Sequence, residues 1–332
     1  MEGTMMKKTF IIIFLLLISL NIFAEINQYN RLFLKPGAYF DYTFNTDKNL
    51  HLELGMVDKY QVMESKDILK TVWSQERDLI GGQLQVESNY YTHAISSSNA
   101  IGLLQMKYMT AEDLYVYNLF DPYDNLKGAL EYHGYLRRIF GEEKKQIAAY
   151  HDGPGTIKNN GMTDSGELYY LKVKKAQENY QNTGIYSPQV YGVSIDFIGN
   201  ELKTDFYYNI AYRKMELYTS LNTNIIKNDG IIKSEMNLDY SFLYYPRTNF
   251  AYGLNNFNGV IRLGLPWEYF VIKFNNENQL YFQKKLGDYF IFKMDIKNNS
   301  AYFGAGFLIS NIKSFVGYEL FNKTISFELQ IY

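Results

Sequence analysis

The sequence contains no cysteine among its 332 residues. This absence excludes disulfide bonds, thiolate metal sites, cysteine nucleophiles and the lipid-bearing cysteine of bacterial lipoproteins. Acidic residues only slightly outnumber basic ones, since the formal net charge is −2 at pH 7. No broad positive field therefore points to nucleic acid as a partner. Three of the four histidines, His51, His93 and His133, have no ligand-like spacing, so we predict no metal site and no cofactor.

The apolar run near the N-terminus is also short. The apolar run Phe10–Leu20 falls below the ~20 residues that a membrane-spanning helix needs. Lys7 and Lys8 precede the run, and the small residue Ala24 follows it. This order is typical of a secretory signal peptide at residues 1–24, and the alternative is an uncleaved membrane anchor. We expect an exported protein.

The chain is long enough for two domains, and the two halves differ in composition. Tryptophan is scarce, with 2 residues, whereas 32 tyrosines and 23 phenylalanines are present and gather in the second half. Residues 25–64 are interpreted as a linker or a β-hairpin, since Gly37–Phe44 and His51–Val57 flank a polar turn. We expect a helical domain at 65–182 and an antiparallel β domain at 183–332.

The central segment places one carboxylic acid at the end of an apolar helix. Leu79, Ile80 and Leu84 have helical spacing, and the helix is expected to end near Glu87. Apolar surroundings disfavour the ionised form of a carboxyl group, so Glu87 would hold a proton near neutral pH. The alternative for a glutamate at such a position is a solvated surface charge.

Four further motifs follow Glu87-Ser88 in a fixed order. They are Ala94-x-Ser96, Ala100-x-Gly102-Leu103-x-Gln105, Asp121-Pro122-x-x-Asn125 and Ala148-Ala149-Tyr150-His151-Asp152-Gly153-Pro154-Gly155. Together they resemble the SLT-type catalytic domain of the lytic transglycosylases, which has a goose-lysozyme-like fold. The resemblance covers about a third of the chain, from Asp78 to Tyr180.

The resemblance implies a role for each matching position. Glu87 corresponds to the single catalytic acid and base, and Gly102 to a glycine that lets the backbone approach the sugar. The cleft that binds the peptidoglycan glycan strand would be lined by Ser96, Gly102, Gln105, Met106, Tyr150, His151 and either Tyr169 or Tyr170. The implied reaction cleaves the MurNAc–GlcNAc bond, and the MurNAc 6-hydroxyl attacks its own anomeric carbon to give a 1,6-anhydro product.

Some positions depart from the family pattern. His151 stands where asparagine is usual, Asp152 where a small residue is usual, and Lys107 where methionine is common. A chargeable His151 makes a steeper pH dependence possible. Two alternatives follow: a goose-lysozyme-like hydrolase with Asp152 as its second acid, or a degenerate domain that binds glycan without cleaving it.

From Tyr191 onward the hydrophobic period changes to two. Alternating segments separated by turns indicate roughly ten strands, among them 191–197, 206–212, 236–244, 290–296 and 325–331. Their length and apolar outer face are typical of an outer-membrane β-barrel in contact with lipid, and a soluble β-sandwich is the alternative. Tyr332 lies out of phase with Phe327, Leu329 and Ile331. If the hairpin near residues 39–57 joined the barrel, it would add two strands, with the helical domain inserted between strands.

Overall fold

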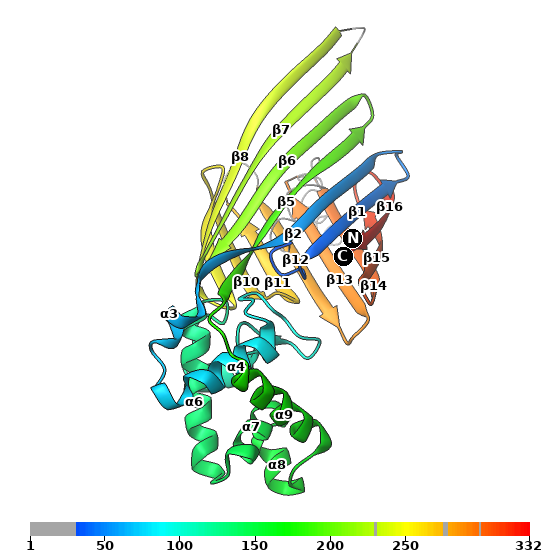
Figure 1. The fold of residues 1–332 in the computed structure, drawn as a ribbon. Coiled ribbons are helices and arrows are strands. Elements are labelled where there is room, and N and C mark those ends of the chain that lie inside the picture. Colours follow the sequence, from blue (N-terminus) through cyan, green and yellow to red (C-terminus); the bar gives the residue numbers. More distant parts are fainter. Residues whose placement is uncertain (1–30, 229–230, 275–277, 299) are drawn as a thin grey trace. The chain divides into compact units, whose positions relative to one another are not determined.

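The computed structural model describes residues 31–228, 231–274, 278–298 and 300–332 (Figure 1). The signal peptide expected at 1–24 lies outside these residues. The chain divides into two compact units. The barrel unit takes in the chain up to Asp58 together with Gln189–Ala211 and Met215–Tyr332, and the helical unit takes in Lys59–Pro188 and Tyr212–Lys214.

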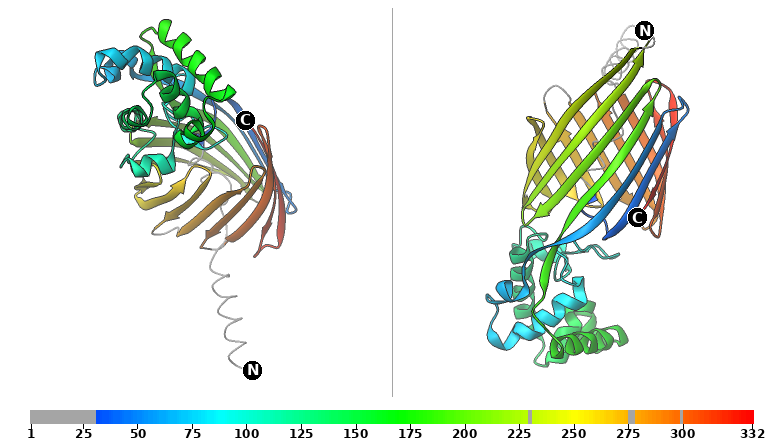
Figure 2. Two further views of the ribbon diagram at one scale, coloured as in Figure 1. Left: turned by 90° about the horizontal axis from the view of Figure 1, so that it is seen from below. Right: turned by 45° about the horizontal axis from the view of Figure 1, so that its top comes forward.

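The barrel unit is a closed antiparallel β-barrel (Figure 2). In the described residues its strands are β1 Gly37–Asn45, β2 Leu50–Glu64, β5 Gly184–Ile198, β6 Glu201–Tyr212, β7 Met215–Asn228, β8 Ile231–Arg247, β9 Phe250–Asn255, β10 Asn258–Leu265, β11 Glu268–Lys273, β12 Gln279–Leu286, β13 Phe290–Lys297, β14 Ser300–Ile309, β15 Ile312–Glu319 and β16 Thr324–Ile331. Sequential strands are neighbours from β5 to β16, and β1 pairs with both β16 and β2 to close the ring. Because β2 and β5 are also neighbours, the helical segment is a sequence insertion between them.

The antiparallel barrel is confirmed, but the expected strand number of about ten is wrong, because the barrel has 14 strands in the described residues. Two strands come from the hairpin of β1 and β2. Other strands, such as β9 and β11, were not recognised in the sequence because they have only 6 residues each. The two-residue turns beside them, Asn256–Phe257 and Pro266–Trp267, also lack the Asn-Gly signature of a hairpin. Phe257 has a left-handed φ of 65°, a conformation that is uncommon for phenylalanine and so is not expected from the sequence.

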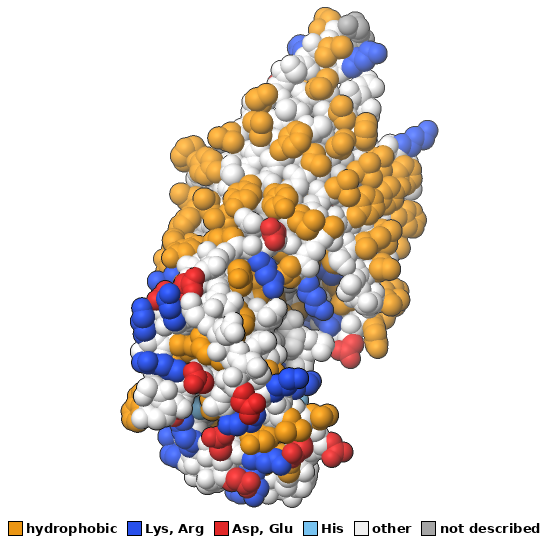
Figure 3. All heavy atoms as spheres, viewed as in Figure 1, with side chains coloured by type: hydrophobic (Ala, Val, Ile, Leu, Met, Phe, Trp, Pro, Cys, Tyr) orange, Lys and Arg blue, Asp and Glu red, His pale blue; other side chains and the backbone are white. Residues whose placement is uncertain are grey.

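Side chains alternate between an apolar outer face and a polar interior. In β16, Ile325 and Phe327 are exposed, whereas Ser326 and Gln330 are buried. Figure 3 shows hydrophobic side chains spread over the outer surface of the strands. Tyr332 belongs to the inner set, because its hydroxyl hydrogen bonds to Gln330, and this accounts for its phase in the sequence.

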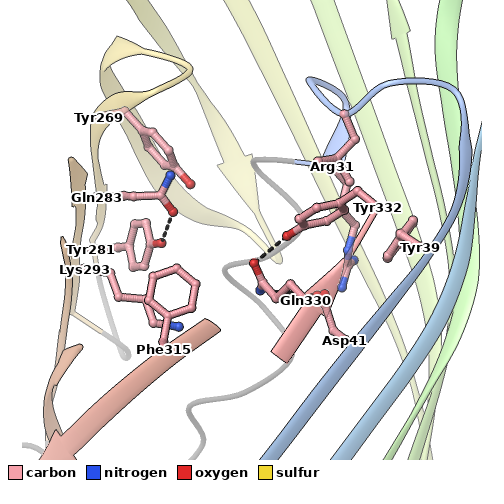
Figure 4. A pocket seen from close by; sticks show the side chains of 11 residues that line it. Arg31, Tyr39, Asp41, Tyr269, Tyr281, Gln283, Lys293, Phe315, Gln330 and Tyr332 are labelled. Carbon is pink, nitrogen blue, oxygen red and sulfur yellow. Dashed lines mark hydrogen bonds between the residues drawn. The ribbon is translucent and has the colours of Figure 1, made fainter. Parts of the chain in front are cut away.

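The barrel interior is filled by a buried polar network and by the segment just before β1. Arg31 Nη2 donates to Glu53 at 2.5 Å, and the Arg31 guanidinium lies 4.2 Å from the ring centroid of Tyr207. Leu32 packs in a cluster with residues of β1, β2, β5, β6 and β7. Arg31 also lines a small pocket with Tyr332 and with Lys293 of β13 (Figure 4). Residues 31–34, called the lumen segment below, therefore lie in the barrel interior.

The helical unit contains α3 Ser65–Leu69, η1 Ser74–Glu76, α4 Arg77–Ser88, β3 Ala100–Ile101, β4 Met106–Lys107, α5 Tyr108–Asp113, α6 Pro122–Ile139, α7 Glu143–Asp152, α8 Pro154–Asn160 and α9 Asp164–Glu178. Asp121 caps α6 by accepting hydrogen bonds from the backbone of Tyr123 and Asp124. Helices α4 and α9 touch closely, since a Cβ on Gly82 would lie 2.5 Å from the Gln177 nitrogen. No helix in the described ranges is long and apolar enough to cross a membrane.

Candidate active site

Glu87 lies in the last turn of α4, one residue before the helix ends at Ser88. Asn89 follows with a left-handed φ of 48°, a common way for a helix to end. Burial raises the pKa of Glu87 to about 7, although a hydrogen bond from Tyr169 and the charge of His151 act in the opposite direction. A carboxyl group with this pKa can donate and accept a proton near neutral pH.

A chain of hydrogen bonds connects Glu87 to the interior of the helical unit. The Tyr169 hydroxyl donates to Glu87 Oε1 at 2.5 Å and accepts from Gln83 Nε2 at 2.9 Å. Gln83 Oε1 accepts from His133 Nε2 at 2.7 Å. Burial lowers the pKa of His133 to about 4, so this histidine is neutral and carries its proton on Nε2.

Sequence reasoning missed Gln83, and it considered His133 only as a metal ligand, a role that the spacing did not support. The spacing contains a signal, because Gln83 and Glu87 are four residues apart and lie on one face of α4. The sequence also left open whether Tyr169 or Tyr170 faces the acid. Tyr169 contacts Glu87, whereas the ring of Tyr170 lies 5.6 Å from the ammonium group of Lys144.

Two residues of the motif at the end of α7, Tyr150 and His151, stack on aromatic rings of this hydrogen-bonded chain. The ring of His151 stacks on that of Tyr169 with centroids 4.7 Å apart, and the ring of Tyr150 stacks on that of His133 at 4.8 Å. The Tyr150 hydroxyl donates to the carbonyl oxygen of Leu104 at 2.7 Å. Tyr150 and His151 therefore pack on His133 and Tyr169, the two ring-bearing residues that hydrogen bond to Gln83.

Asp152 is held by its neighbours. It pairs with His151 Nδ1 at 2.6 Å, and it accepts hydrogen bonds from the hydroxyls of Thr163 and Ser165 at the start of α9. Burial acts to raise the pKa of Asp152, but these three hydrogen bonds outweigh it and hold the pKa below its usual range. Asp152 is thus an ionised partner of His151.

The loop between α4 and α5 holds the other expected site residues. Ser96 Oγ accepts from the Ala100 backbone nitrogen at 3.0 Å. Gln105 Nε2 donates to the carbonyl oxygens of Ala94 and Gly102, at 3.0 and 2.8 Å. Both side chains are only partly buried, so they shape the loop and keep polar atoms near its surface.

Gly102 and Met106 face the protein interior. Gly102 has a φ of +82°, and an added Cβ would lie 2.2 Å from both Asn125 Nδ2 and the Leu119 carbonyl oxygen. Asn125 donates to Ile101 and Leu119 and accepts from the Leu104 nitrogen at 2.9 Å. The glycine therefore makes room for the amide that fixes the loop. Met106 is 3% exposed and lies beside Gly128.

A metal ion has no evident site in the part of the chain that the structure describes. No three His, Asp or Glu side chains there come close enough together to hold one. Within the described residues, Glu87 accepts a hydrogen bond from Tyr169, and the ring of Tyr169 stacks on that of His151.

Comparison with protein families assigns this unit. Residues 71–171 match the family model described as the transglycosylase SLT domain. The match contains Glu87, the loop of Gly102 and Gln105, and Tyr169. Such domains carry lytic transglycosylase-type activity on peptidoglycan glycan strands in general. The chain therefore combines a helical transglycosylase SLT domain with a closed antiparallel β-barrel.

Proposed function

We propose that the helical unit is a peptidoglycan lytic transglycosylase in which Glu87 acts first as acid and then as base. Glu87 protonates the glycosidic oxygen between MurNAc and GlcNAc, and the bond to the MurNAc anomeric carbon breaks. The resulting Glu87 carboxylate takes the proton of the MurNAc 6-hydroxyl. At the same time the 6-oxygen forms a bond to the MurNAc anomeric carbon. The observation that carries the proposal is the raised pKa of a partly buried Glu87, about 7, which suits both steps.

A single carboxyl group is sufficient for this reaction because the substrate supplies the nucleophile. A glycosidase that uses water requires a second carboxylate as base or nucleophile. Asp152 is the candidate from the motif, yet Thr163, Ser165 and His151 already occupy its oxygens. These contacts support the anhydro-forming reaction over hydrolysis.

We further propose that the protein is exported by the segment 1–24 and that the barrel holds it in the outer membrane, with the SLT domain acting on the cell wall. The exposed apolar side chains on the outer strand faces support contact with lipid. The chain has no cysteine to carry a lipid anchor, so a barrel would serve as the tether. Unfolding-dependent gel mobility and retention in the membrane after osmotic shock test this location, and full release by osmotic shock would contradict it.

The reaction is tested by digesting purified sacculi and identifying the products by mass. Products ending in 1,6-anhydro-MurNAc are expected, and Glu87→Gln should abolish their release while the variant stays folded. Glu178→Gln is the matched control, since Glu178 is an exposed residue near the end of α9. Reducing-end products would favour hydrolysis, and sacculus binding without turnover would favour a non-catalytic domain. Full activity of Glu87→Gln would refute both catalytic proposals.

A further inference from the structure

Residues 88–94, called the connecting loop below, join Glu87 to the loop that carries Gln105. The connecting loop begins with a sharp turn, in which Tyr90 has a left-handed φ of 63°. It ends at Ala94, whose oxygen accepts a hydrogen bond from Gln105 Nε2 at 3.0 Å. The path of the connecting loop therefore sets the position of the acid relative to Gln105.

The first residues of strand β5 hold the middle of the connecting loop. The Tyr186 nitrogen donates to the Tyr90 oxygen at 2.9 Å, and the Tyr186 oxygen accepts from the Thr92 nitrogen at 2.9 Å. Tyr91 and Tyr186 thus form a parallel β-bridge outside the main sheet. A single residue of β5 therefore fixes the backbone of the loop on both sides of Tyr91.

A buried row of polar side chains fixes the same point of the loop. Ser187 Oγ hydrogen bonds to Thr92 Oγ1 at 2.8 Å, and Thr92 Oγ1 hydrogen bonds to His93 Nδ1 at 3.0 Å. All three side chains are buried. The ring of His93 in turn stacks on that of Phe120, with centroids 4.8 Å apart. Because a buried polar group that loses its partner is costly, this row resists movement of the loop away from β5.

This support comes from outside the segment that matches the transglycosylase SLT domain. The match ends at residue 171, whereas the bonds to the connecting loop come from Tyr186 and Ser187. Pro188 is the last residue of this stretch of the helical unit. From Gln189 onward β5 belongs to the barrel unit and pairs with β6. One strand therefore contributes both to the barrel and to the loop that follows the acid.

We propose that Tyr186 and Ser187 are positioning residues for Glu87, which they hold in place through the connecting loop. The inference rests on the proposed function, in which Glu87 is the acid. An acid must lie within hydrogen-bond reach of the glycosidic oxygen, and a small displacement from that geometry lowers the rate. Loosening the connecting loop should therefore lower kcat, whereas KM should change little, since these residues act through the loop and not on the substrate.

Removal of one hydroxyl from the full-length protein in detergent tests the proposal. Thr92→Val deletes the bond to Ser187 and should lower kcat for cleavage of soluble glycan strands by about twofold to tenfold, with KM nearly unchanged. Thr92→Ser keeps the hydroxyl and should restore kcat. Thr71→Val is the matched control, because the Thr71 hydroxyl donates to the Ile68 oxygen at 2.8 Å in another part of the helical unit. Its kcat should equal that of the native protein.

The backbone bond is tested separately at Tyr186. Tyr186→Pro lacks the N–H that donates to the Tyr90 oxygen, whereas Tyr186→Ala keeps it. The proline variant should lose kcat at unchanged KM, and the alanine variant should keep it. Circular dichroism and Tm check that each variant is folded, and the two Thr92 variants decide the proposal if proline prevents folding.

The measured rate counts every glycosidic bond cleaved, whatever the product. Hydrolytic products from the native protein would therefore contradict the proposed function and leave the test of the positioning residues intact. Native kcat in a folded Thr92→Val variant with a lower Tm would show a purely structural role and would overturn the inference. Equal losses of kcat in Thr92→Val and Thr92→Ser would also overturn it, because the hydroxyl bond would then have no part in the effect.

Discussion

Replacing Tyr169 with phenylalanine isolates the effect of one hydrogen bond on the acid. The Tyr169 hydroxyl donates to Glu87 Oε1 at 2.5 Å and so stabilises the ionised carboxylate, whereas burial raises the Glu87 pKa to about 7. A hydrogen bond to a charged group contributes ~1.5–3 kcal/mol. One pKa unit corresponds to ~1.4 kcal/mol. Loss of the hydroxyl should therefore raise the Glu87 pKa by about 1–2 units.

The sign of this shift fixes the expected pH profile. Glu87 donates its proton in the first step, so activity falls as the pH rises through its pKa, and a higher pKa moves this alkaline limb to higher pH. The assay is kcat/KM for release of anhydro products from soluble glycan strands between about pH 5 and pH 10. Tyr170→Phe is the matched control, because Tyr170 lies beside Lys144 and should leave the limb in place. An unmoved limb with Tyr169→Phe would refute the tuning role of the hydroxyl.

Four further substitutions test other parts of the structure. His151→Asn removes a charge that lowers the Glu87 pKa, so the alkaline limb of kcat/KM should again move upward. Glu87→Gln should raise the Tm of the helical unit at pH 8 and leave it nearly unchanged at pH 4, because the folded-state pKa of Glu87 is raised from 4.5 to about 7 and the native protein therefore loses stability as the pH rises between these two values. Gly102→Ala should lower the free energy of unfolding by at least about 1–3 kcal/mol, through the left-handed φ and the clash with Asn125. Arg31→Ala should loosen the lumen segment and raise the ion conductance of the barrel in planar bilayers above that of the native protein, because it removes the cation that pairs with the buried Glu53.

Each of these has a result that would contradict it. The His151 argument fails if the limb of the variant matches the native one. The Glu87 argument fails if the gain in Tm is equal at both pH values. A Gly102→Ala variant as stable as the native protein would mean that the loop near Leu119 relaxes freely. Equal conductance of the native and Arg31→Ala barrels would mean that the lumen segment does not seal the barrel.

Sequence reasoning placed Glu87 at the end of a helix, as the structure shows, but it did not anticipate the side chains that surround this carboxyl group. Glu87 could be placed because an apolar helix and four ordered motifs converge on one carboxyl group. Gln83 and His133 could not, because their role depends on α4, α6 and α9 meeting in three dimensions. A short motif reports which residues are near in sequence, whereas a hydrogen-bonded chain across three helices depends on packing.

The barrel was predicted in kind but not in strand number. Period-two alternation in long strands such as β8 and β16 gives a clear signal, since one face meets the outside and the other the lumen. Strands of six residues such as β9 give few alternations, and their two-residue turns lack glycine. The lumen segment at Arg31 had no sequence signal, because its partner Glu53 is 22 residues away.

The insertion between β2 and β5 links the folding of the helical unit to closure of the barrel. The two strands are neighbours in the ring, yet the chain between them runs from residue 65 to residue 183. Bringing the ends of a disordered loop of that length together costs about 4 kcal/mol of chain entropy. The folded unit holds its own ends together, since the Ser65 nitrogen donates to the Thr183 oxygen at 2.7 Å and Ser65 Oγ accepts from the Thr183 nitrogen at 3.0 Å. A folded SLT domain therefore already holds the ends of β2 and β5 close together, which reduces the entropy cost of pairing the two strands.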